Sequence, residues 1–162
     1  MLDNINSLFM LAAWLMLFPL TYLAHIAEEY WCGDGYSKYL LTNYLVELSP
    51  QRFLWLQALG VSLMTLGVVA GLALRFPMTM LAMLSAIVLG NALVHTIRSL
   101  HGWMYTPGLI TAVALWLPLG CISLVALWPF TSASKLALAL AVGITTNCLV
   151  EAISMRRTKD QG

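Results

Sequence analysis

Five long apolar segments dominate the sequence, and they decide what kind of fold the chain can adopt. They cover residues 7–31, 50–74, 77–100, 107–128 and 133–155. Each has the length of about 20 mostly apolar residues that a helix needs to cross a bilayer. In lipid, only helices and closed barrels satisfy all their backbone hydrogen bonds. The segments therefore predict an all-α, polytopic membrane protein with five transmembrane helices.

Composition supports this interpretation. Of the 162 residues, 60% are hydrophobic and only 9% are charged, whereas a soluble domain carries about 25% charged residues. A chain of this size cannot cover so much apolar surface with its own core. The net charge of +1 gives no reason to expect a nucleic-acid partner. The scattered cysteines, Cys32, Cys121 and Cys148, form no CxxC pair and predict free thiols.

The connections between these segments are short, so we expect a single transmembrane domain over residues 1–162. The one long connection follows the first segment. Within it, residues 36–48 have apolar side chains at helical spacing and one polar face. This pattern predicts a short helix lying in the membrane interface, where it could act as a lid. An irregular surface loop is the alternative.

The basic residues predict how the protein is oriented. With five spans, the connections after the first and third spans lie on the same side as the C-terminus. That side carries Lys38, Arg52, Arg98, Arg156, Arg157 and Lys159, and the other side carries Arg75 and Lys135. Because basic residues concentrate on the cytoplasmic side, we expect an external N-terminus and a cytoplasmic C-terminus. The membrane would be the bacterial inner membrane or an equivalent one.

Polar side chains gather near one end of the odd-numbered spans. The first span has His25, Glu28 and Glu29, the third has Asn91, His95 and Arg98, and the fifth has Asn147 and Glu151. Spacings of three and four residues place each set on one face of its helix. Odd-numbered spans run in the same direction, so the three sets are expected at one depth on the cytoplasmic side. Gln57 and Thr111 fall at a similar level.

These residue types predict a metal site. An ionisable group inside the hydrocarbon costs at least about 2.5–3.5 kcal/mol, so such groups face the bundle interior and serve a function. Imidazoles and carboxylates bind divalent metals such as zinc, iron or manganese. We expect His25, His95 and Glu28, or Glu29 in place of Glu28, to bind one metal ion, with zinc or iron as the first candidates. The predicted catalytic residues are Glu29, Glu151, Asn91, Asn147 and Arg98.

Within this set, Glu151 is the candidate general base and the two asparagines would orient ligands. Two other interpretations remain open. The charged groups could be solvated among the lipid headgroups. Alternatively, they could form a purely structural ion-pair cluster, for instance Arg98 with Glu28 or Glu151.

The stretch His25-Ile26-Ala27-Glu28-Glu29 resembles the motif of the HXXEE family of small membrane proteins. Residues 91–95 (NALVH) and 105–111 (YTPGLIT) resemble further parts of that family's pattern. The resemblance extends from the first span through the fourth. It implies a membrane fold and the polar residues named above, and it implies no particular reaction.

Taken together, the residues favour a membrane-embedded, metal-dependent enzyme that acts on a lipid or isoprenoid-like substrate, by hydrolysis or oxidation, at the cytoplasmic leaflet. One alternative is a metal-free acid–base enzyme, by analogy with five-helix sterol isomerases. Another is a small cation or proton carrier, although polar groups are sparse in the outer halves of the spans. A structural subunit is the fourth hypothesis. Membrane lipids are the expected partners, and the Gly67–Gly71 spacing is compatible with a homodimer.

Overall fold

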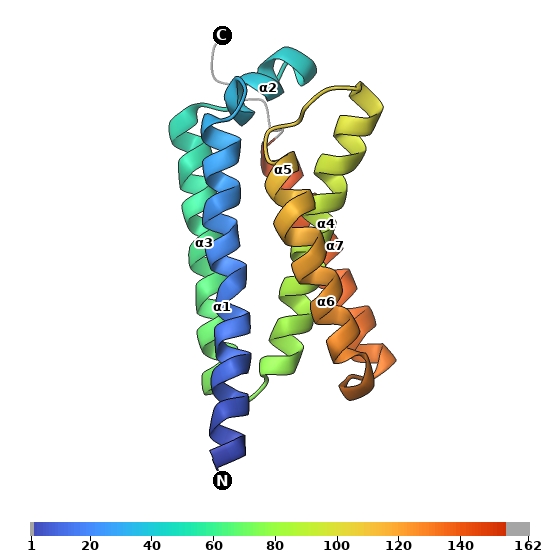
Figure 1. The fold of residues 1–162 in the computed structure, drawn as a ribbon. Helices are drawn as coiled ribbons and strands as arrows, with labels where there is room; N and C mark the ends of the chain where they lie inside the picture. The colour runs from blue at the N-terminus through green and yellow to red at the C-terminus, as the bar shows by residue number, and fades with distance from the viewer. Residues whose placement is uncertain (1, 155–162) are drawn as a thin grey trace.

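The computed structural model describes residues 2–154, and the side chains of residues 6–153. Over this range it is helical and contains no strand. Four helices of membrane length are α1 (Leu2–Trp31), α3 (Pro50–Ala73), α4 (Pro77–Gly102) and α7 (Ala133–Ser154). The remaining span is Leu109–Phe130 (Figure 1). The predicted all-α protein with five membrane-length helices is confirmed.

The remaining span changes its helix type along its length. It begins with α5 (Leu109–Thr111), continues as the π-helix η1 (Ala112–Trp116) and α6 (Leu117–Leu127), and ends with the 3₁₀ turn η2 (Trp128–Phe130). Pro118 explains the wide π turn. Proline has no N–H to donate, and in a regular α-helix its ring clashes with the carbonyl four residues earlier. π turns of this kind often occur at functional sites.

The start of α3 is capped by the residue before it. The Ser49 hydroxyl accepts a hydrogen bond from the Arg52 N–H at 3.2 Å, and Pro50 occupies the first position of α3. The turn between α3 and α4 is tight, with Arg75 in the left-handed region at a φ of 62°. Of the basic residues used to predict the orientation, Arg156, Arg157 and Lys159 lie outside the described residues.

The connection after α1 contains the short helix α2 (Gly35–Tyr44). The prediction of a helix here is confirmed, although it ends at Tyr44 rather than at residue 48. Leu45 ends it in the left-handed conformation, at a φ of 54°. Tyr36 and Leu40 are buried and belong to an apolar cluster that includes Phe53 of α3. As a result, α2 lies across one end of the bundle (Figure 1).

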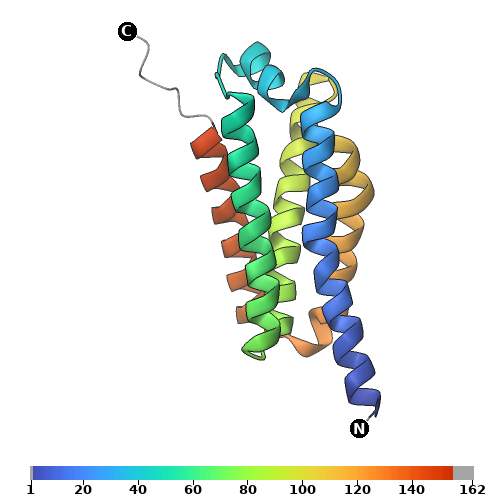
Figure 2. The same cartoon turned by 90° about the vertical axis from the view of Figure 1, so that its left-hand side faces the viewer.

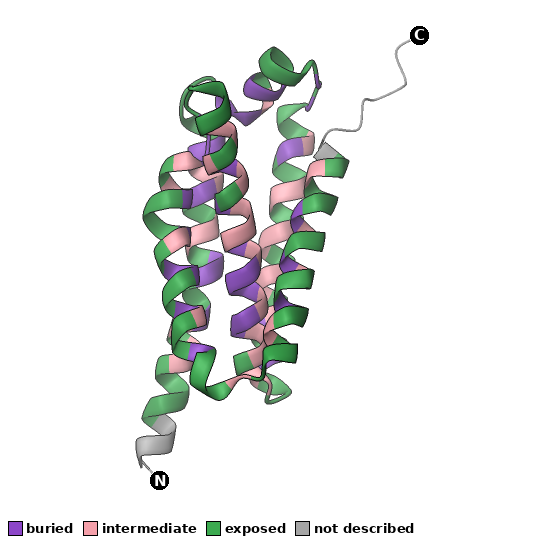
Figure 3. Cartoon of the chain, turned by 90° about the vertical axis from the view of Figure 1, so that its right-hand side faces the viewer, coloured by how far each residue is buried: buried purple, intermediate pink, exposed green. Residues whose placement is uncertain are grey.

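The spans pack in two groups, which lie side by side in Figure 1 and one in front of the other in Figure 2. One group pairs α1 with α3, and the other gathers α6 and α7 around α4. The outward faces are largely exposed, whereas the buried residues face the interior (Figure 3). Leu15, Phe18, Val68 and Leu81 are among the residues that form the main core.

Two glycines of α3 pack against another helix of the same chain. Gly67 and Gly71 face Met80 of α4, and a Cβ atom added at Gly71 would lie 2.8 Å from the Met80 Cβ. The glycines therefore allow α3 and α4 to approach closely in their hairpin. This face is occupied within the chain, so it gives no support to a homodimer.

Candidate functional site

Three side chains with metal-ligand chemistry meet near the end of the bundle that α2 covers. His25 and Glu29 come from α1 and His95 comes from α4, and all three are buried. Glu29 Oε1 lies 3.7 Å from His25 Nε2 and 3.5 Å from His95 Nε2. One ligand atom from each residue lies within 4.8 Å of the other two. We call His25, Glu29 and His95 the His/Glu cluster.

The spacing of these atoms suits a metal better than a direct hydrogen bond. Hydrogen bonds from nitrogen to oxygen have lengths of about 2.7–3.2 Å, and the observed 3.5 and 3.7 Å are longer. A tetrahedral ion with bonds of 2.0–2.2 Å separates neighbouring ligand atoms by about 3.4 Å. The two distances from Glu29 to the histidines are therefore compatible with coordination of one ion.

Hydrogen bonds that involve Thr111 and Glu28 determine the tautomer of the His25 ring. The Thr111 hydroxyl donates to Glu28 Oε2 at 2.5 Å and lies 2.7 Å from His25 Nδ1. A hydroxyl has one proton, so the threonine oxygen accepts from the Nδ1–H of His25. This network assigns the tautomer whose Nε2 carries a lone pair. Within the described chain, that Nε2 is buried and has no hydrogen-bond partner.

A second chain of hydrogen bonds orients Glu29. The Tyr22 hydroxyl donates to Gln57 Oε1 at 2.6 Å, and Gln57 Nε2 donates to Glu29 Oε2 at 2.8 Å. The other oxygen of Glu29 faces the two histidines. Two acceptor atoms, His25 Nε2 and Glu29 Oε1, thus face each other in a buried place. Such an arrangement is costly unless a proton or a metal cation lies between them.

Glu28 accepts its hydrogen bonds from residues at the start of the fourth span. Its Oε1 accepts from the Tyr105 hydroxyl at 2.6 Å and from the Ile110 N–H at 2.8 Å. Its Oε2 accepts from the Thr111 N–H at 2.6 Å. Burial and the hydrogen bond with Glu28 raise the pKa of Tyr105, so its phenol keeps the donated proton. The carboxylate caps the start of the fourth span, and Glu29 takes its place in the cluster.

Gly108 and Trp116 enclose the His/Glu cluster. Gly108 has a φ of 94°, and a Cβ atom there would lie 2.7 Å from His25 Cε1 and 2.8 Å from His95 Cε1. Only glycine lets the backbone approach the two rings this closely. The Trp116 ring stacks on His25 with a centroid distance of 3.9 Å. The cluster is therefore walled by backbone on one side and by an indole on another.

Arg98 and Glu151 form an ion pair beside the cluster. Arg98 Nη2 donates to Glu151 Oε2 at 2.5 Å, and Nη1 donates to the Tyr36 hydroxyl oxygen at 2.9 Å. Burial and the charge of Glu151 raise the pKa of Tyr36, so its phenol stays neutral. The ion-pair alternative raised from the sequence thus applies to these two residues. A carboxylate paired in this way is poorly suited to act as a free general base.

The two asparagines, Asn91 and Asn147, differ in their hydrogen bonds. Asn147 Nδ2 donates to the carbonyls of Gly143 at 2.8 Å and Ile87 at 3.0 Å, and it fastens α7 to α4. Asn91 lines the cavity described next, and within the described chain its Oδ1 is buried without a hydrogen-bond partner. The Asn91 oxygen is thus a buried acceptor that a ligand in the cavity could use.

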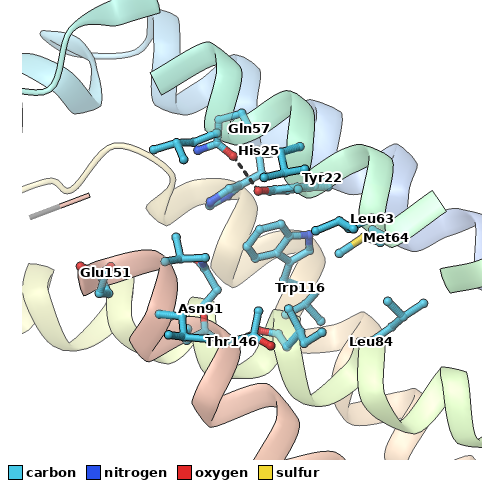
Figure 4. A pocket seen from close by; sticks show the side chains of 18 of the residues that line it. Tyr22, His25, Gln57, Leu63, Met64, Leu84, Asn91, Trp116, Thr146 and Glu151 are labelled. Atoms are coloured by element: carbon cyan, nitrogen blue, oxygen red, sulfur yellow. Dashed lines mark hydrogen bonds between the residues drawn. The ribbon is translucent and has the colours of Figure 1, made fainter. Parts of the chain in front are cut away.

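A cavity of about 480 Å³ extends from the His/Glu cluster into the bundle. In Figure 4, Tyr22, His25 and Gln57 reach it from one side, Asn91 and Glu151 from the other, and Trp116 lies between them. Farther from the cluster its wall is apolar, as Leu63, Met64 and Leu84 show (Figure 4). The cavity thus has one polar end and an apolar body.

The profile of a family described as "Protein of unknown function with HXXEE motif" matches residues 16–123, more than half of the chain. The chain belongs to this family. The matched segment contains the HXXEE motif itself, His95 and Thr111. Asn147 and Glu151 on α7 lie beyond it. Comparisons with curated proteins and with solved structures gave no match.

Several residues that enclose or orient the candidate site were not predicted from the sequence. Tyr22 lies three positions before His25, a spacing that places both on one helical face. Trp116 and Tyr36 are aromatic residues among many, and nothing in the sequence distinguishes them. Gly108 appeared only as part of the family pattern, although a Pro-Gly pair at residues 107–108 is a turn signal.

Proposed function

We propose that this protein is a membrane-embedded enzyme that uses one divalent metal ion to act on a lipid or isoprenoid-like substrate. The observation that supports this proposal best is the His/Glu cluster. One ligand atom from each of its three residues lies within 4.8 Å of the other two, at the polar end of an apolar cavity. Two histidines and one carboxylate are a known ligand set of catalytic zinc and of non-haem iron. Such an ion keeps an open position and supplies Lewis-acid, water-activating or oxygen chemistry.

The chain's own residues would serve this ion in distinct ways. Gln57 and Tyr22 hold the Glu29 carboxylate with one oxygen toward the histidines. Thr111 keeps His25 in the tautomer whose Nε2 can bind a metal. Trp116 and Gly108 exclude water from the cluster, and the apolar body of the cavity would hold the hydrocarbon part of a substrate.

Metal analysis of the purified full-length protein tests the proposal. We expect about one zinc or iron per chain, and a loss of metal affinity in His25→Ala and His95→Ala. Loss of an outer-shell partner already lowers metal affinity by about 10- to 100-fold, so loss of a ligand should cost at least that much. His101→Ala is the matched control, because His101 is an exposed histidine at the end of α4.

Two results would overturn the metal assignment. One is a wild-type protein that holds no stoichiometric metal even after reloading with zinc or ferrous iron. The other is an equal loss of metal in His101→Ala. Either result would remove the His/Glu cluster as a ligand set and leave the fold unaffected.

One observation favours a second candidate, a metal-free acid–base enzyme. The linked groups Glu28, Thr111 and His25 resemble a proton-handling chain. In such an enzyme, a proton held by Glu29 would take the place of the metal. Once a substrate is found, activity that survives strong chelators supports this candidate, and activity that returns only with added metal supports the first.

We also propose that the end of the bundle carrying the His/Glu cluster faces the cytoplasm. Lys38 and Arg52 lie at this end, and Arg75 and Lys135 lie at the opposite end. Cys32 is exposed beside α2, so a membrane-impermeant maleimide should label it in inside-out vesicles and not in spheroplasts. Cys32→Ser is the control, because Cys121 and Cys148 lie within spans. Labelling in spheroplasts instead would reverse the orientation.

A further inference from the structure

The cavity opens sideways between α3 and α7. Leu59 and Leu63 of α3, and Leu149 and Val150 of α7, line the cavity and are also between 47% and 60% exposed. Side chains can do both only at the rim of an opening on the outer surface. The opening is flanked by the two packing groups, because α3 belongs with α1 and α7 belongs with α4. In a membrane this rim would face the lipid chains.

The water-facing end of the cavity is covered. Tyr36 of α2 and Leu48 are buried above it, and both belong to its lining. At the same end, Arg52 Nη2 donates to the Ile153 carbonyl at 3.1 Å and ties α3 to α7. A molecule that reaches the His/Glu cluster therefore comes through the lateral opening, out of the bilayer.

The described side chains that line the cavity offer no cation of their own to an anionic head group. Among the described residues that line the cavity there is no lysine or arginine, whereas two carboxylates, Glu29 and Glu151, are present. The nearby Arg98 already donates to Glu151 and to Tyr36. Proteins recognise phosphate and carboxylate groups chiefly through arginine and lysine. Apart from the proposed metal ion, which can bind a hydroxyl oxygen as well as a carboxylate, the described part of this wall has no cationic partner for an anionic head group.

Asn91 supplies the remaining polar contact. Its Oδ1 is a buried acceptor without a partner in the described structure, and it lies one helical turn before His95 on the same face of α4. An acceptor in this position needs an N–H or O–H donor. A hydroxyl group can donate to Asn91 and still present its oxygen lone pairs to the His/Glu cluster.

We infer that the substrate is a neutral, single-chain lipid with a hydroxyl head group, a long-chain alcohol or a prenol. It would enter between α3 and α7 and place its hydroxyl between Asn91 and the His/Glu cluster. The cavity of about 480 Å³ lies within the range of pockets that hold one small ligand. This inference rests on the proposed function, since it names the substrate class of the same site.

Photolabelling of the full-length protein in nanodiscs tests the inference. The probe is hexadecanol carrying a diazirine on its chain, and the matched probe is the corresponding hexadecanoic acid. We expect the alcohol to label the rim residues of α3 and α7, and excess unlabelled alcohol to abolish the labelling. The acid should label these residues much less. Asn91→Ala should weaken alcohol binding about five- to tenfold, the effect of one lost hydrogen bond.

The variant Leu63→Trp places bulk at the rim and should reduce labelling inside the cavity. Its control is Ile122→Trp, because Ile122 is 54% exposed on α6 and does not line the cavity. Labelling spread evenly over all spans, or equal labelling by acid and alcohol, would overturn the inference. Measuring metal content and photolabelling on the same preparation, before and after chelation, separates the two proposals. If the protein binds metal but the alcohol does not label the rim residues, the substrate class is wrong and the metal site stands. If the alcohol labels the rim residues but the protein binds no metal, the metal site is wrong and the lipid cavity stands.

Discussion

The Glu28→Ala variant is expected to unfold about 10 °C below the wild-type protein. Glu28 accepts hydrogen bonds from the Tyr105 hydroxyl, the Ile110 N–H, and both the N–H and the hydroxyl of Thr111. Removing the carboxylate leaves these donors without an acceptor. Removing the shared acceptor of this partly buried network costs about 3–5 kcal/mol, since each hydrogen bond to a charged group is worth about 1.5–3 kcal/mol. A change of 1 kcal/mol shifts the Tm of a chain this long by about 2–4 °C. Thermal unfolding in detergent measures the change.

Two further variants serve as comparisons. Glu47→Ala removes an exposed carboxylate and should leave the Tm unchanged. Glu29→Ala should lose the metal and lose less stability than Glu28→Ala, because one side-chain hydrogen bond, from Gln57, holds Glu29 in place. A Glu29→Ala variant that is as unstable as Glu28→Ala, and that still binds metal, would contradict this division of roles.

The two carboxylates of the HXXEE motif differ because of their angle around α1. At about 100° per residue, Glu28 projects about 60° to one side of His25 and Glu29 about 40° to the other. Glu28 thereby meets the start of the fourth span at Ile110, and Glu29 meets Gln57 of α3. A motif with adjacent glutamates thus serves two neighbours at once, one as a helix cap and one in the His/Glu cluster.

Much of the fold could be predicted, because lipid imposes strict length and polarity on each span. The apolar segments gave the five helices, and Pro50 and Pro77 marked the starts of α3 and α4. Polar residues at helical spacing placed His25 and His95 at one level, where the structure brings them together. These features depend on local sequence or on the direction of the spans.

The rest depends on how each helix is rotated against its neighbours. Sequence spacing places Glu28 and Glu29 equally well beside His25, so it could not decide which one joins the cluster. The pairing of Arg98 with Glu151 depends on α4 packing against α7. Trp116 reaches His25 through the π turn before Pro118, a local change of helix type that hydrophobic periodicity does not reveal.

Gly108→Ala is expected to abolish metal binding without removing any ligand. The new Cβ would lie 2.7 Å and 2.8 Å from ring carbons of His25 and His95, and 3.1 Å from Glu29 Cγ. All three members of the His/Glu cluster would have to move, and backbone at a φ of 94° strains alanine as well. Displacing the ligands should lower metal affinity by at least the roughly 10- to 100-fold that loss of an outer-shell partner causes.

Gly33→Ala is the control that separates displacement of the metal ligands from backbone strain. Gly33 also has a positive φ, 62°, but its added Cβ would meet only the Tyr105 ring, at an ordinary 3.5 Å. Both variants should lose the roughly 1–2 kcal/mol that a left-handed conformation costs an alanine, which thermal unfolding measures. Only Gly108→Ala should lose metal in a titration with zinc or ferrous iron. If it binds metal as tightly as Gly33→Ala does, the ion is held elsewhere than between His25, Glu29 and His95.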